Sequence, residues 1–143
     1  MEQSADLQRF LDAQADAYDT ALAELKRGRK TSHWMWFVFP QIAGLGHSAM
    51  ARFYAIESLD EARAYLAHPV LGPRLIASVT AVNALQGRTA HAIFGSPDDM
   101  KFRSSLTLFA QAAPEEAVFA EALAKYFGGR LDEMTLERIT AKN

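Results

Sequence analysis

Residues 30–41 read Lys-Thr-Ser-His-Trp-Met-Trp-Phe-Val-Phe-Pro-Gln, and this segment constrains the fold more than any other. Both tryptophans of the chain lie here, and six consecutive residues, 34–39, are apolar. A run that is apolar on all sides has to be buried on all sides, so other elements must surround it. We therefore expect residues 30–41 to lie at the centre of the core and to form the floor of any binding site.

The apolar run is compatible with a short helix or with a buried strand, because a continuous run of this length has no diagnostic period. Ser32 would serve as the N-cap of a helix, and Pro40 would end it. We favour the helix, since no other segment is a good partner for a strand. The buried strand is the alternative.

The rest of the chain shows helical periodicity together with helical start and stop signals. Ser58 and Glu61 have the spacing of a capping box, and Ser96-Pro97-Asp98-Asp99 has the cap, proline and acids that are typical of a helix start. The predicted helices cover residues 6–27, 32–39, 48–54, 58–68, 69–87, 96–113 and 114–127, with Ser48 at the start of the third. Thr89 is expected to cap a single turn over residues 89–94, and residues 131–139 form a short final helix or turn. The predicted fold is all-α, a compact single domain (residues 1–143) with a multihelical array of about six to eight helices.

Composition narrows the classes of function. The net charge is −2, from 15 basic and 17 acidic residues, which argues against binding to nucleic acid or to membrane surfaces. The absence of cysteine excludes disulfides and thiolate chemistry. The first residues do not resemble a signal peptide, and no apolar run approaches the roughly 18 residues that span a bilayer. We expect a cytoplasmic protein without a cofactor.

Three segments resemble a known family. They read GRKTSHWMWFVFPQIAGLGHS, AYLAHPVLGPRL and IFGSPDDMKFRSSLTLF. Together they are similar to the domain-of-unknown-function family 1810, and the likeness extends from about Leu7 to Leu136. The resemblance implies a compact, all-helical bacterial protein, and it implies no catalytic residues.

The first candidate site is the junction that leads into the aromatic run. Free amides at a helix N-terminus bind anions, and nearby cations strengthen the attraction. An aromatic ring beside them can stack on a base or a sugar. The candidate ligand-binding residues here are Lys30, Ser32, His33, Trp34, Trp36 and Gln41. The structural alternative is that Ser32 caps the helix and both tryptophans belong to the core.

Histidine offers one candidate for catalysis and none for metal binding. His33 borders the aromatic run, so it is the residue we would choose for acid–base chemistry. The four histidines lack any spacing typical of metal ligands, and no metal site is expected.

The second candidate site lies on the helix predicted over residues 96–113. Lys101, Ser104 and Ser105 share an approximate face at three- and four-residue steps, so they are further ligand-binding candidates. Hydroxyls in the middle of a helix can instead bond to the carbonyl groups of the preceding turn, which is the structural alternative. If Lys101 is buried its charge needs a partner, and Asp98 lies one turn back.

Two functional hypotheses follow. In the first, residues 30–41 and 101–107 form a pocket for a small anionic ligand of nucleotide or sugar-phosphate type, with or without catalysis. In the second, the chain is a non-enzymatic protein-interaction module whose aromatic run lies entirely in the core. A concave pocket in which Lys101 and His33 converge within hydrogen-bonding reach would favour the first hypothesis. Burial of both tryptophans, with Lys30 directed into solvent, would favour the second.

Overall fold

The structure, a computed structural model, describes residues 2–142 and the side chains of residues 7–140. The helices in this range are α1 (Glu2–Arg27), α2 (Met35–Val38), α3 (Ala49–Phe53), α4 (Leu59–Ala67), α5 (Leu71–Asn83), α6 (Ala90–Phe94), α7 (Asp98–Ala112), α8 (Ala117–Phe127) and α9 (Glu133–Lys142). Residues 2–142 contain no strand beyond a parallel bridge between Ile42 and Ile56. The predicted all-α fold is confirmed, and the aromatic run forms a helix rather than a strand. None of the described helices is both long and apolar enough to cross a membrane.

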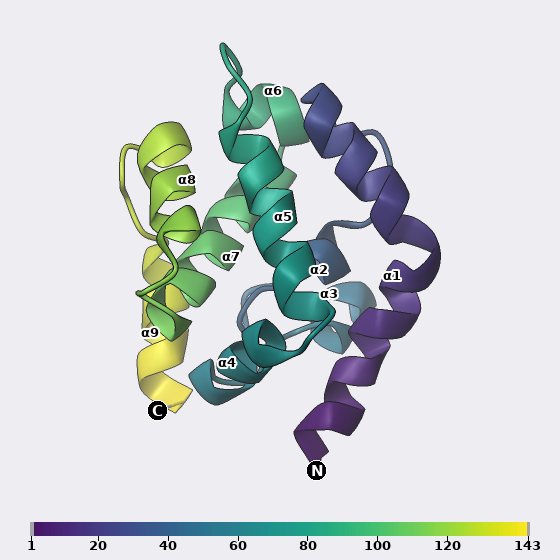
Figure 1. Cartoon of the computed structure of the whole chain (residues 1–143). Helices are drawn as coiled ribbons and strands as arrows, with labels where there is room; N and C mark the ends of the chain where they lie inside the picture. Colours follow the sequence, from purple (N-terminus) through teal and green to yellow (C-terminus); the bar gives the residue numbers. More distant parts are fainter. Residues whose placement is uncertain (1, 143) are drawn as a thin grey trace.

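Helix α7 is the most enclosed element of the fold. It crosses behind α5 in Figure 1 and contacts α4, α6, α8 and α9. Residues 104–109 are all buried, so neighbours cover α7 on every side. Phe102, Leu106 and Phe109 are buried, whereas Ala110 is half-buried. The centre of the core therefore belongs to α7 as much as to the aromatic run.

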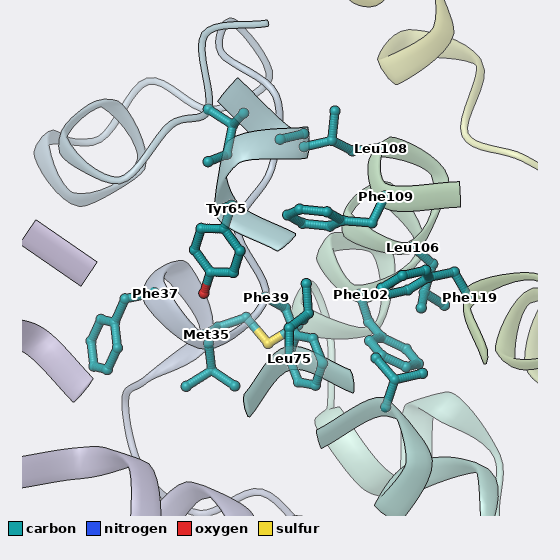
Figure 2. Close-up of a cluster of buried hydrophobic side chains, with 14 of the residues drawn as sticks. Met35, Phe37, Phe39, Tyr65, Leu75, Phe102, Leu106, Leu108, Phe109 and Phe119 are labelled. Atoms are coloured by element: carbon teal, nitrogen blue, oxygen red, sulfur yellow. The ribbon is translucent and has the colours of Figure 1, made fainter. Parts of the chain in front are cut away.

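The aromatic run joins this core through Phe39. The Phe39 ring meets Phe94 and Phe102 edge to face, with centroids 5.9 and 5.0 Å apart. Figure 2 shows Phe39 and Phe102 beside Leu75, with Tyr65 and Phe109 above them. The run's buried members are Trp34, Met35, Phe37, Val38 and Phe39. Trp36 is half-buried, so one of the two tryptophans stands at the edge of the core.

Several predicted helix caps are present. The hydroxyls of Ser48, Ser58 and Thr89 accept hydrogen bonds from backbone amides three residues later. The Glu61 carboxylate completes its capping box on the amide of Glu57 rather than on that of Ser58. These local signals operate over one helical turn, which explains why sequence alone finds them.

Two predicted caps are wrong. Trp34, not Ser32, is the N-cap of α2, because the Ser32 hydroxyl donates to a carboxylate of another helix. Pro97, not Ser96, is the N-cap of α7. The amide that Ser96 would have capped, that of Asp99, donates instead to the carbonyl oxygen of Gly95. In both cases a competing partner displaces the local one.

Gly72 sets how closely α4 and α5 pack. A Cβ atom at this position would lie 2.0 Å from the carbonyl oxygen of Leu66, which is far inside van der Waals contact. Only a residue without a side chain therefore fits between the two helices.

We predict that Gly72→Ala lowers the free energy of unfolding by at least about 2 kcal/mol, because the helices must separate to admit the methyl group. Urea denaturation measures the change. Ala77→Ser, an exposed substitution on the same helix, is the control and should be nearly neutral. A Gly72→Ala variant as stable as the control would show that the interface yields without cost.

Candidate functional site

The junction between α1 and α2 is built around the Glu24 carboxylate. Glu24 is buried, and its Oε1 atom accepts hydrogen bonds from the amides of Thr31 (2.8 Å) and Ser32 (3.0 Å) and from the indole Nε1 of Trp34 (2.9 Å). Its Oε2 atom accepts from the Ser32 hydroxyl at 2.5 Å. Four donors from one short turn thus converge on a single side chain.

This turn has the anion-binding character expected from the sequence, but Glu24 of the same chain occupies it. Amides, a hydroxyl and an indole N–H aimed at one point form a cradle for negative charge. The Glu24 carboxylate fills that cradle from the last turns of α1. The Ser32 hydroxyl is therefore already bonded to Glu24, and this bond helps to hold the junction together.

Glu24 is not among the residues predicted from the sequence, although its position on α1 contains a signal. The buried stripe of α1 runs through Leu7, Phe10, Ala21 and Leu25, and Glu24 adjoins it. A charged residue at such a position needs internal partners, because unpaired buried charge is very costly. A pattern of apolar residues alone does not include this polar member of the buried face.

Hydrogen bonding controls the ionisation of Glu24. Burial by itself raises the pKa of the carboxyl group, but the bonds from the Ser32 hydroxyl, the Thr31 amide and the Trp34 indole outweigh it. The pKa falls from its ordinary value of 4.5 to about 2. The carboxylate is therefore charged at neutral pH, as its four donors require.

Next to this junction, two lysines share one carboxylate. Lys30 Nζ lies 2.9 Å from Oδ2 of Asp98, and Lys101 Nζ lies 3.2 Å from Oδ1. Asp98, the partner suggested for Lys101 by the sequence, thus also receives Lys30 from the other end of the junction. The Lys30 backbone amide donates to the carbonyl oxygen of Ile93 (2.7 Å), which ties this part of the chain to α6.

Each lysine also stands over a tryptophan. Lys30 Nζ is 5.2 Å from a ring centroid of Trp34, and Lys101 Nζ is 4.9 Å from that of Trp36. Both distances lie within the range of a cation–π interaction. The Lys30 side chain is only 9% exposed and the Lys101 side chain is 27% exposed. Four candidate residues from two distant segments are therefore brought together around Asp98, with Lys101 the more accessible cation.

A pocket opens beside Trp36. Its volume is about 130 Å³, and its walls are the loop 41–46 and residues 51–57, with Trp36 on one side. Hydrogen bonds hold the two walls together: the Ala43 amide donates to the carbonyl oxygen of Ile56, and the Ile56 amide donates to that of Gln41, both at 2.8 Å. Gln41 and Trp36, two of the predicted ligand-binding residues, thus line the same pocket.

The remaining candidates lie outside this arrangement. The Ser104 hydroxyl is bonded to the carbonyl oxygen of Met100 (3.1 Å) and to Asp132 Oδ2 (3.0 Å) at the start of α9. Ser105 is buried within the core. His33 is exposed, and a catalytic role for it stays a prediction.

The acids at the start of α7 do not assemble into a metal centre. Asp99 Oδ2 lies 3.7 Å from His91 Nδ1, and Asp98 is taken up by the two lysines. Across the part of the chain that the structure describes, no group of three or more histidine, aspartate or glutamate side chains could hold a metal ion.

Comparison with known protein families gives a match over most of the chain. The family described as "Protein of unknown function (DUF1810)" matches residues 4–139. The chain belongs to this family. The resemblance noted in the sequence is thereby confirmed. Comparison with curated proteins gives no match.

A solved structure shares the fold of this DUF1810 member. It is the crystal structure of the conserved hypothetical protein Rv1873 from Mycobacterium tuberculosis, and the sequences are 52% identical. The match covers 94% of this chain and 96% of the mycobacterial chain, with a TM-score of 0.93. The two proteins therefore share the whole helical domain.

Glu24 should make stability depend on pH in a defined window. Because folding lowers the pKa of this group, its contribution is complete above about pH 4.5 and is lost as the pH falls toward 2. The two pKa values correspond to roughly 3 kcal/mol. We predict that Glu24→Gln is less stable than wild type at pH 7 and that this difference shrinks progressively below pH 4.5. Chemical denaturation across pH 2–7 measures it.

The exposed Glu121→Gln provides the matched control, since it removes the same charge from a surface position. Its difference from wild type should stay small throughout. If the Glu24→Gln difference were independent of pH, the carboxylate would not carry the junction's negative charge.

Proposed function

We propose that the protein binds a small anionic compound beside Trp36, with Lys101 contacting the anionic group and the pocket receiving the rest. The observation that carries the proposal is the shared position of Trp36. Its ring lies under the Lys101 ammonium, and the same residue lines the pocket. One ligand could therefore engage both features at once.

The charge arrangement favours Lys101 as the contact. An ammonium group has three donors, and the pairing with Asp98 at 3.2 Å leaves others available. Lys30 is nearly covered, so it acts as a fixed positive charge that offsets Asp98. Asp99 adds negative charge to the same helical turn but is directed toward His91. Of the two lysines, Lys101 is thus the one that solvent and ligand can reach.

Pocket size limits what can enter. The volume of about 130 Å³ is close to the roughly 150 Å³ of a cavity that admits benzene. A single ring therefore fits inside, whereas a whole nucleotide would extend beyond it. This supports a compact ligand, or a larger one that inserts one ring.

Ligand binding can be tested by thermal unfolding with inorganic phosphate, sugar phosphates, nucleoside monophosphates and small carboxylates. A compound at 100 times its Kd stabilises the folded state by about 2.7 kcal/mol, which raises Tm visibly. We predict that at least one compound does so for wild type and that Lys101→Ala abolishes the effect.

Lys26→Ala is the control, because it removes one exposed lysine from the end of α1. It should respond to ligand as wild type does. Equal responses from the Lys101→Ala and Lys26→Ala variants would place the anion elsewhere, and no response from any protein would reject the proposal.

A second candidate function is protein interaction through α3. Phe53 and Met50 are 58% and 40% exposed on this short helix, and large apolar side chains that gather on a surface mark interaction sites. The version in which the aromatic run is entirely in the core is weakened by the half-buried Trp36. Sedimentation at increasing concentration tests whether two copies pair here. Association that is lost in Phe53→Ser would support this candidate, and a monomer throughout would exclude self-pairing.

A further inference from the structure

We infer that the pocket beside Trp36 accepts a sugar ring, and that the ligand is a sugar carrying a phosphate group that reaches Lys101. This inference rests on the proposed function and narrows its ligand class. It follows from the chemistry of the pocket walls, from the charges of the lining and of Lys101, and from the close packing of the loop.

The pocket walls mix one aromatic ring with groups that bond to hydroxyls. Gln41, Arg52 and Glu57 line it together with Trp36. An amide both donates and accepts hydrogen bonds, a guanidinium only donates, and a carboxylate only accepts. A sugar hydroxyl can do either, so a polyhydroxylated ring can bond both to the amide of Gln41 and to the guanidinium of Arg52. The C–H face of the same ring can lie against an indole.

A flat nucleobase fits this pocket less well than a sugar ring does. A base stacks best between two parallel apolar surfaces, and Trp36 supplies one. The other ring in the lining, Tyr54, packs against Phe37 and Phe53, with centroids 5.4 and 4.8 Å apart. These contacts hold Tyr54 in the surrounding aromatic cluster. The pocket therefore offers a single stacking surface, with the side chains of Gln41 and Arg52 as hydrogen-bonding groups in an otherwise mainly apolar lining.

The charge of the pocket lining differs from the charge at Lys101. Within the pocket, Arg52 and Glu57 have opposite signs, so the lining favours an uncharged group. Lys101 stands over the ring, 4.9 Å from its centroid. The ligand should therefore carry its anionic group outside the ring that enters the pocket. A phosphate joined to a sugar through a short link has this form.

The pocket loop is tightly packed. A Cβ atom on Gly46 would lie 2.7 Å from the Cβ of Ala51, and one on Gly44 would lie 2.9 Å from the Arg138 guanidinium. The Ile42–Ile56 bridge fixes the adjoining chain. Such packing leaves the pocket preformed, so its selectivity should appear directly in equilibrium affinities.

Calorimetry with three phosphates that differ only in the attached group tests the inference. The probes are ribose 5-phosphate, phenyl phosphate and inorganic phosphate. We expect wild type to bind ribose 5-phosphate at least tenfold more tightly than the other two. Gln41→Ala should remove most of this advantage while leaving the affinity for inorganic phosphate unchanged. The substitution spares the backbone, whose Gln41 carbonyl group supports the bridge.

The outcomes separate this inference from the proposed function. Equal affinity for ribose 5-phosphate and inorganic phosphate would overturn the sugar subsite while leaving an anion site at Lys101. Tighter binding of phenyl phosphate would overturn it in favour of a flat aromatic group. Lys101→Ala should weaken binding of all three probes by a similar factor, and failure of all three to bind wild type would remove both proposals.

Discussion

The buried Glu24 carboxylate determines how the first third of the chain is arranged. Its four hydrogen bonds join α1 to the turn that precedes α2, and each donor is fixed in direction by the carboxylate it meets. The position of this turn then determines where Trp34 enters the core and where Lys30 leaves it. A buried charge is tolerated because it is fully hydrogen-bonded, and the low pKa of the group is the expression of that bonding.

In the neighbouring cluster of Asp98, Lys30 and Lys101, charge is again matched by a partner inside the protein, but here two cations share one carboxylate. Asp98 is divided between Lys30 and Lys101, so one of the two positive charges is compensated before any ligand is present. What distinguishes the two lysines is access, since Lys30 is enclosed and Lys101 faces the surface beside Trp36. Compensation keeps the cluster stable in the absence of ligand, while the exposed member retains the capacity to bind. The site therefore combines a rigid inner half with an accessible outer half.

The fold was largely predictable from the sequence, whereas the site was predictable only in part. Periodicity and short-range caps act within a few residues, so helices such as α4 were found with nearly correct ends. The pairing of Lys101 with Asp98 is also local, one helical turn apart. The arrival of Lys30 at the same carboxylate depends on how α1 and α7 are placed in three dimensions, and no pattern in the chain encodes it directly. Hydrophobic periodicity does not predict that the polar Ser104 of α7 is buried, because its partner Asp132 comes from the segment just before α9.

The contrast between the two tryptophans has a practical consequence. Trp34 is enclosed and hydrogen-bonded to Glu24, while Trp36 is half-buried at the mouth of the pocket. An indole's emission responds to the polarity and charge around it, so the two rings should behave as separate optical reporters. One would register the integrity of the junction, and the other would register occupancy of the surface beside Lys101. The protein thus has one intrinsic fluorophore at the junction and another at the proposed binding surface, so folding and binding should be observable separately.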